Sequence, residues 1–170
     1  MNKDTQNGDR ELFEQESFEV RDLQDEIRVD GLCERLLNLF YADQVQQSGL
    51  QPEEASVLAY GASYFLKEFV VPALRENIYA LKPGRVRQFA GNWYIVKNME
   101  PNMAELKGIL EGVEAFYEFA HRAGRVPAEL LEAIRRDCAD LDYYRGRIED
   151  FWNIGDGGYP EWERQCSLKG

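Results

Sequence analysis

The chain has 170 residues, of which 44% are hydrophobic and 12% aromatic, and its formal net charge is -11 at pH 7. The length predicts one domain, and the apolar content suffices for a buried core, which excludes a wholly disordered protein. Residues 1–30 carry ten acidic and four basic side chains, so the acidity is concentrated at the front of the chain. This charge opposes long-range attraction to nucleic acids and anionic lipids.

The sequence carries no recognisable targeting or membrane signal. Its first residues lack the basic-then-apolar order of a signal peptide, and no run of 18 uncharged apolar residues occurs. We therefore expect a cytoplasmic protein that does not contact a membrane.

The three cysteines are odd in number and far apart, with no C-x-x-C pair. That spacing argues against a disulfide framework and against a thiolate zinc site. Cys33 and Cys138 fall on apolar helical stripes and are expected to be buried, whereas Cys166 in the tail is expected to be an exposed thiol.

The front of the chain contains the least regular predicted elements. Residues 1–10 are polar and are predicted to be disordered. The sparse apolar side chains of residues 11–28 indicate a marginal helix docked by a narrow edge, or an arm that orders only against a partner. Asp30 is a suitable N-cap for a helix over residues 31–47.

Two further helices are predicted before residue 100. Residues 52–80 open with a proline and two acids and then keep one apolar stripe. Pro72 interrupts the hydrogen bonding of that helix, so we expect a kink near residues 69–71. A shorter helix over residues 85–98 is expected to bury Phe89, Trp93 and Val96, among others.

Residues 103–124 form the most regular amphipathic pattern and predict the central core helix. Asn102 is its expected N-cap, with Glu105 three residues later as in a capping box. Gly108 and Gly112 lie beside the apolar stripe, where they would let another backbone approach closely. The stripe consists of Leu106, Ile109, Leu110, Val113, Phe116, Tyr117 and Ala120.

The last long helix is predicted over residues 127–154, where apolar spacing continues to a glycine-rich stop. Residues 155–170 are then expected to form a flexible tail, with pinning of residues 159–170 by Trp162 as the alternative. Taken together, the patterns predict an all-α, single-domain helical bundle of about five to six helices, with residues 11–154 as the helical domain.

Residues 82–99 are the strongest candidate interaction segment, because they contain cations and aromatic rings but no acid until Glu100. Such a combination can bind single-stranded nucleic acid through charge and stacking. The alternative is a core helix whose cations pair with acidic neighbours. The candidate interaction residues are Arg85, Arg87, Trp93, Tyr94 and Lys97.

Two weaker candidates involve acidic side chains. Glu118 and His121 have the E-x-x-H spacing of di-iron bundles, but that site needs two such motifs and His121 is the only histidine. The Asp137 cluster, consisting of Asp137, Asp140 and Asp142, could supply an acid and a base or hold magnesium, and Asp137 and Asp140 share a helix edge. A solvated acidic face is the simpler interpretation. No nucleophile elbow or activated-cysteine signature is present, so we predict no catalytic residue and no cofactor.

The order of elements around residues 86–127 resembles a known family. A short aromatic helix, a turn with proline and then a helix ending in Phe116, Tyr117 and Phe119, followed by Gly124 and Pro127, is similar to the SAM-like core-binding domain of tyrosine recombinases. The resemblance implies a helical fold and DNA contact. The catalytic set of that family is not found in these residues, because the single histidine, His121, lacks an arginine three residues later, and we expect no catalytic domain.

Three hypotheses about function remain from the sequence. The first is a non-catalytic helical module that binds a protein partner or a second copy, using exposed aromatic positions. The second is a nucleic-acid accessory protein that uses residues 82–99, and the third is a small-molecule or metal-binding helical enzyme built on Glu118, His121 and the Asp137 cluster. The aromatic contact positions of the first hypothesis are Tyr60, Tyr64, Tyr79 and Trp162.

Overall fold

A computed structural model describes residues 8–166 and confirms the all-α prediction: the chain is 74% helical, with no strand among these residues. The elements in chain order are η1 (Gln15–Phe18), α2 (Leu23–Gln46), α3 (Pro52–Ser63), η2 (Tyr64–Leu74), α4 (Arg85–Gln88), η3 (Phe89–Trp93), α5 (Tyr94–Lys97), α6 (Met103–Arg122), α7 (Ala128–Ala139), α8 (Leu141–Trp152) and α9 (Tyr159–Arg164). Residues 1–7 and most of the predicted disordered segment 1–10 lie outside the described part, although Gly8 to Glu11 are helical.

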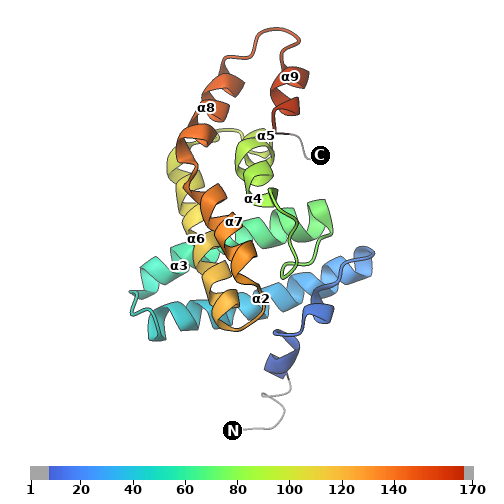
Figure 1. The fold of residues 1–170 in the computed structure, drawn as a ribbon, viewed down its shortest axis with the longest axis vertical. Coiled ribbons are helices and arrows are strands. Elements are labelled where there is room, and N and C mark those ends of the chain that lie inside the picture. The colour runs from blue at the N-terminus through green and yellow to red at the C-terminus, as the bar shows by residue number, and fades with distance from the viewer. Residues whose placement is uncertain (1–7, 167–170) are drawn as a thin grey trace.

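Helix α2 and the continuous α3–η2 helix form an antiparallel hairpin at one end of the molecule (Figure 1). Helix α6 crosses this hairpin, and α7 runs back along α6. The α8–α9 hairpin lies at the opposite end (Figure 1). One core cluster links the hairpin, α6 and α7, so the described residues share one hydrophobic interior.

The closest helix crossing is between α3 and α6, and glycine makes it possible. A Cβ atom on Gly112 would lie 2.3 Å from the carbonyl oxygen of Leu58, and one on Gly61 would lie 2.9 Å from Cα of Ile109. The predicted close approach at Gly112 is therefore confirmed. Gly108 has nothing within 4 Å of its Cβ position, so its predicted role in the crossing was wrong.

The N-terminal segment is docked more firmly than its sparse pattern predicted. Leu12 and Phe18 are buried, and two side chains of the 77–79 loop hold the segment. The Tyr79 hydroxyl donates to the carbonyl of Leu12 at 2.6 Å, and Asn77 Nδ2 donates to that of Gln15 at 2.8 Å. The arm is thus part of the fold.

Helix α2 starts eight residues before the expected position. Asp22, and not Asp30, is its N-cap, because the Asp22 carboxylate accepts from the backbone N–H of Asp25 at 2.9 Å. The additional turns place Leu23 and Ile27 on the outside, 64% and 68% exposed. These two side chains therefore do not dock the segment onto the core.

Segments η2 and η3 are π-helical and pack against each other through aromatic rings. Phe89 lies 5.2 Å from Phe65 and 5.3 Å from Phe69 between ring centroids. A π turn holds more residues than an α turn, so the residues after it are rotated relative to the α-helical expectation. Tyr94 is consequently buried while Val96 is 38% exposed, which corrects the predicted inward position of Val96.

The α3–η2 helix ends at Leu74, because Arg75 adopts a left-handed conformation with φ 49°. The prediction that this helix reaches residue 80 was therefore wrong. Pro72 lies inside the π-helical part, at the place where an irregularity was expected. By length and composition Pro52–Leu74 could cross a membrane, with mean hydropathy 1.2. Here Phe65 and Phe69 of that helix belong to the buried core.

The predicted helix over residues 127–154 is divided into α7 and α8 at Asp140, whose ψ is 50°. The Tyr144 hydroxyl donates to the carbonyl of Asp137 at 2.5 Å and so satisfies an acceptor at the break. Apolar spacing continues across Asp140, which is why the sequence pattern did not reveal the division.

The tail is folded back onto the body as far as residue 166, so of the two predicted alternatives the one in which Trp162 pins it is correct and the flexible tail is wrong. Trp162 of α9 is buried, and its indole donates to the Arg147 carbonyl at 3.0 Å. The Arg147 guanidinium in turn donates to the carbonyls of Trp162 at 2.7 Å and Gly91 at 2.8 Å. Residues 167–170 lie outside the described part.

All three cysteines are free and buried, which confirms the expectation for Cys33 and Cys138 and corrects it for Cys166. Burial raises the pKa of Cys33 to about 12, and burial also raises the pKa of Cys138 and Cys166. Because the thiolate is the reactive form, we expect no thiol to react with Ellman's reagent at pH 7.5 until urea unfolds the protein. One rapidly reacting thiol in the native protein would instead show that α9 detaches from the body.

Candidate functional site

Two of the four cations of residues 82–99, Arg85 and Arg87, form ion pairs within the fold. Arg85 forms an ion pair with Glu76 at 2.8 Å, and both side chains are largely buried. Arg87 lies 3.4 Å from Asp140, and its guanidinium stacks 3.9 Å from the ring centroid of Tyr143. Each arginine therefore has an acidic partner within the protein, Glu76 for Arg85 and Asp140 for Arg87.

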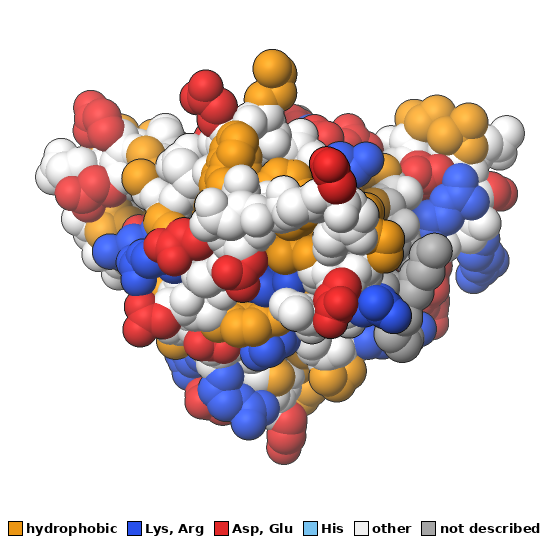
Figure 2. Space-filling view, turned by 90° about the horizontal axis from the view of Figure 1, so that it is seen from above, with side chains coloured by type: hydrophobic (Ala, Val, Ile, Leu, Met, Phe, Trp, Pro, Cys, Tyr) orange, Lys and Arg blue, Asp and Glu red, His pale blue; other side chains and the backbone are white. Residues whose placement is uncertain are grey.

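The aromatic residues of the same segment are also divided. Tyr94 is buried, and its hydroxyl contacts Glu105 Oε1 at 2.8 Å beside the start of α6. Burial raises the pKa of Tyr94. Trp93 is half-buried and Lys97 is exposed. Figure 2 shows one face of the molecule, on which Lys and Arg side chains are interspersed with Asp and Glu.

Glu118 and His121 make separate structural contacts. Glu118 accepts from Arg135 at 3.0 Å, while His121 Nδ1 lies 2.8 Å from the carbonyl oxygen of Val126 in the turn after α6. Within residues 8–166, no group of three His, Cys, Asp or Glu side chains is arranged to hold a metal ion.

The aspartates of the predicted Asp137 cluster contact different partners. Asp140 faces Arg87, and the neighbouring Asp142 pairs with Arg145 at 2.7 Å. Burial raises the pKa of Asp137, opposed by a hydrogen bond from the Arg87 backbone. Asp137 and Asp140 therefore lie beside the contact between α4 and α7, where both interact with Arg87.

The four aromatic contact positions have different surroundings. Tyr79 and Trp162 are buried, so they are not available to a partner, which corrects that prediction. Tyr60 is 57% exposed, and its ring centroid lies 6.3 Å from that of half-buried Tyr64. Tyr60 is thus the position from this set that is open to solvent.

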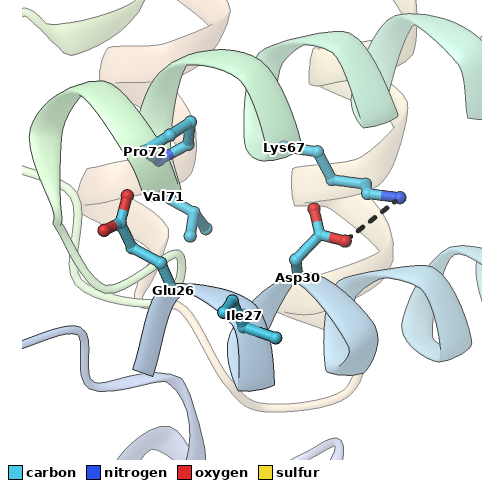
Figure 3. A pocket seen from close by; sticks show the side chains of 6 residues that line it. All are labelled: Glu26, Ile27, Asp30, Lys67, Val71 and Pro72. Carbon is cyan, nitrogen blue, oxygen red and sulfur yellow. Dashed lines mark ion pairs between the residues drawn. The ribbon is translucent and has the colours of Figure 1, made fainter. Parts of the chain in front are cut away.

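Two hollows lie one after the other between α2 and the α3–η2 helix, and we call them together the seam groove. Its first hollow has a volume of about 240 Å³. The residues that line it are Glu26, Ile27 and Asp30 from α2 and Lys67, Val71 and Pro72 from η2 (Figure 3). Ile27 forms an exposed apolar wall, while Val71 is buried at the opposite side. Because Pro72 has no backbone N–H, a carbonyl of the preceding turn lacks its usual helical donor beside this hollow.

The second hollow lies further along the same two helices and has a volume of about 250 Å³. The residues that line it are Glu34, Leu37, Asn38 and Tyr41 from α2 and Ser56, Ala59, Tyr60 and Ser63 from α3. We call it the tyrosine end of the seam groove. Lys67 stands between the hollows, because it pairs with Asp30 at 3.7 Å and is also hydrogen-bonded to Glu34.

The first half of α2 gives the seam groove an acidic border. Asp22 to Glu34 contain five acids and one base. Asp30 and Glu34 remain 51% and 63% exposed in their side chains despite sharing Lys67. The hydrogen bond from Lys67 lowers the pKa of Glu34, so this carboxylate stays ionised at neutral pH. A ligand with positive charge is favoured here.

A wider hollow of about 480 Å³ lies between the 79–83 loop and the start of α7. Its walls include Leu81, Pro127 and Leu130, and Arg125 stands at its rim. The Arg125 guanidinium donates to the carbonyl of Phe13 at 3.0 Å, so its charge already serves the N-terminal arm. Its size suits a small molecule, but none of Glu118, His121 and Asp137 lines it, so it does not bring together the residues of the third hypothesis.

Comparison of the chain with protein-family models, curated proteins and solved structures gave no match. The similarity of residues 86–127 to tyrosine recombinases therefore stays a prediction.

Sequence reasoning identified Tyr60 but missed the other residues of the seam groove. The sparse apolar pattern of residues 11–28 predicts that Leu23 and Ile27 dock the segment. Their separation by one helical turn, without a continuing apolar stripe, is equally typical of an exposed pair, as the structure shows. The partnership of Glu34 with Lys67 joins positions 33 residues apart. No local pattern could have shown it.

Proposed function

We propose that this protein is a non-catalytic helical interaction module that binds a partner protein in the seam groove. The observation that carries the proposal is the exposure of Ile27 in the wall of a hollow and of Leu23 four residues before it, on a helix whose remaining apolar side chains are mostly buried. Exposed aliphatic side chains next to a groove are typical of protein-binding sites. Their burial against a partner would remove about 25 cal/mol of unfavourable free energy per Å² of apolar surface.

The acidic border determines the kind of partner. A basic segment would be attracted to Asp30 and Glu34, whereas an acidic one would be repelled. A second copy of this chain is a poorer occupant, because its own charge is -11. The partner is therefore expected to be a different protein with lysine or arginine beside its apolar contact residues.

The nucleic-acid hypothesis receives less support from the same geometry. Arg85 and Arg87 are paired with Glu76 and Asp140, so stacking and charge do not combine on one open surface. Binding of DNA by residues 82–99 would require these ion pairs to break.

A photo-crosslinking amino acid at Ile27 tests the proposal in cells that naturally produce the protein. We expect a discrete crosslinked protein band from position 27, because this side chain is 68% exposed beside the hollow. Position 152 is the matched control: Trp152 is 57% exposed but belongs to α8 at the opposite end of the molecule (Figure 1). Equal crosslinking from both positions, or none from position 27, would count against the seam groove as the binding surface.

A further inference from the structure

We propose that the tyrosine end of the seam groove binds an extended, proline-rich segment of the partner, flanked by arginine or lysine. This inference rests on the proposed function of the seam groove and adds the chemistry of its occupant.

The residues that line the hollow suit a proline-rich ligand. The aromatic rings of Tyr41 and Tyr60 line it together with the small side chains of Ser56, Ala59 and Ser63. A polyproline II chain has three residues per turn and presents narrow ridges of proline rings, which aromatic-lined grooves accept.

The polar atoms of the hollow are suited to the same ligand. Within the described residues, the hydroxyls of Tyr41 and Tyr60 and the amide of Asn38 make no hydrogen bond to the protein. A proline-rich chain offers backbone carbonyls as acceptors and few N–H groups in need of a partner. Donors on tyrosine and asparagine therefore match what this ligand displays.

The Tyr60 ring at the hollow is supported by further rings of the protein. Its centroid lies 6.3 Å from that of Tyr64, which in turn lies 6.1 Å from that of Trp93. Tyr64 and Trp93 are half-buried and do not line the hollow. The aromatic contact with proline is therefore assigned to Tyr41 and Tyr60.

Charge and composition identify the ligand as a segment of another protein. Glu34 lines the hollow with a side chain 63% exposed, and it can receive an arginine or lysine that flanks the prolines. The six prolines of this chain are never closer than 11 residues to one another, so a second copy could not supply such a segment.

Fluorescence anisotropy with the full chain tests the assignment. The probe is a labelled ten-proline peptide with two arginines at one end, and the control peptide replaces the prolines with alternating glycine and serine. We expect saturable binding of the proline peptide, at least tenfold tighter than that of the control. Tyr60→Ala is expected to raise its Kd at least tenfold, and Tyr60→Phe to raise it by a smaller factor because the ring remains. Trp152→Ala should change the Kd less than twofold.

Equal affinity for the two peptides, or a Kd unaffected by Tyr60→Ala, would overturn the assignment. A basic amphipathic helical peptide is the third probe, and tighter binding of that peptide would identify a helix as the occupant. If position 27 crosslinks to a partner while the proline peptide fails, the occupant is wrong and the proposed function stands. If both fail, the proposed function falls as well. Circular dichroism of each variant verifies that it is folded.

Discussion

Replacing Gly112 with alanine is expected to lower the free energy of unfolding by about 3 kcal/mol, at the upper end of the usual cost of overpacking. The added Cβ would lie 2.3 Å from the Leu58 carbonyl oxygen and 2.9 Å from the backbone nitrogen of Ala62. Both are backbone atoms, so no side-chain rotation can relieve the clash. Helices α3 and α6 must separate, and the core between them must open.

Gly108→Ala is the matched control on the same helix. Its Cβ would have nothing within 4 Å, so this change is expected to raise stability by up to about 1 kcal/mol through helix propensity. Urea unfolding followed by far-UV circular dichroism measures both variants. A similar loss of stability in the two would show that the glycines matter for some reason other than the α3–α6 crossing.

Replacing Arg147 with methionine is expected to cost about 3 kcal/mol, because two buried carbonyls lose a charged donor. Arg147 is 2% exposed and lies over the Trp162 ring at 4.0 Å, and it forms no ion pair with a carboxylate of the described residues. Burial lowers the pKa of Arg147. The carbonyls of Gly91 and Trp162 therefore stabilise a charge that would otherwise be costly to bury.

The Arg147 variant has a local readout as well as a global one. Limited proteolysis should cleave the Arg147→Met protein between α8 and α9 before the body unfolds, because Trp162 loses its clamp. Arg145→Met is the control, since Arg145 pairs with an Asp142 side chain that is 98% exposed, and it should leave stability close to that of the wild type. If Arg147→Met is as stable as the wild type, apolar packing alone holds α9.

Local sequence signals were sufficient for the elements with regular periodicity. The stripe of α6 and its N-cap Asn102 are as expected, since the Asn102 side chain accepts from the Glu105 backbone at 2.8 Å. Helix period and capping depend on residues within one or two turns, so they can be derived from spacing alone.

The remaining features depend on contacts that spacing does not encode. The π-helical register at Phe89–Trp93 leaves the Gly91 carbonyl as an acceptor for Arg147, 56 residues later. The break at Asp140 is satisfied by the Tyr144 hydroxyl, while the apolar pattern runs on. Arg85 is a predicted nucleic-acid contact, yet in the structure it pairs with Glu76. Glu76 follows the end of the α3–η2 helix at Leu74, whereas the apolar pattern predicts that this helix continues to residue 80.

For the proposed function, too, part of the evidence can be derived from the sequence and part depends on tertiary packing. The acidity of the first half of α2 is visible in the sequence. The groove beside it exists only because η2 packs antiparallel to α2 and brings Val71 and Pro72 next to Ile27. Sequence patterns could therefore suggest an interaction protein but could not locate its surface.

The most direct test of the account is the affinity of the purified protein for the partner recovered by crosslinking at position 27. Isothermal titration calorimetry should show that Ile27→Asp raises the Kd at least tenfold while its urea unfolding curve matches that of the wild type. Trp152→Asp, at the opposite end of the molecule, should leave the Kd within twofold. Unchanged affinity of the Ile27→Asp protein, or an equal loss in both variants, would contradict the seam groove as the binding surface.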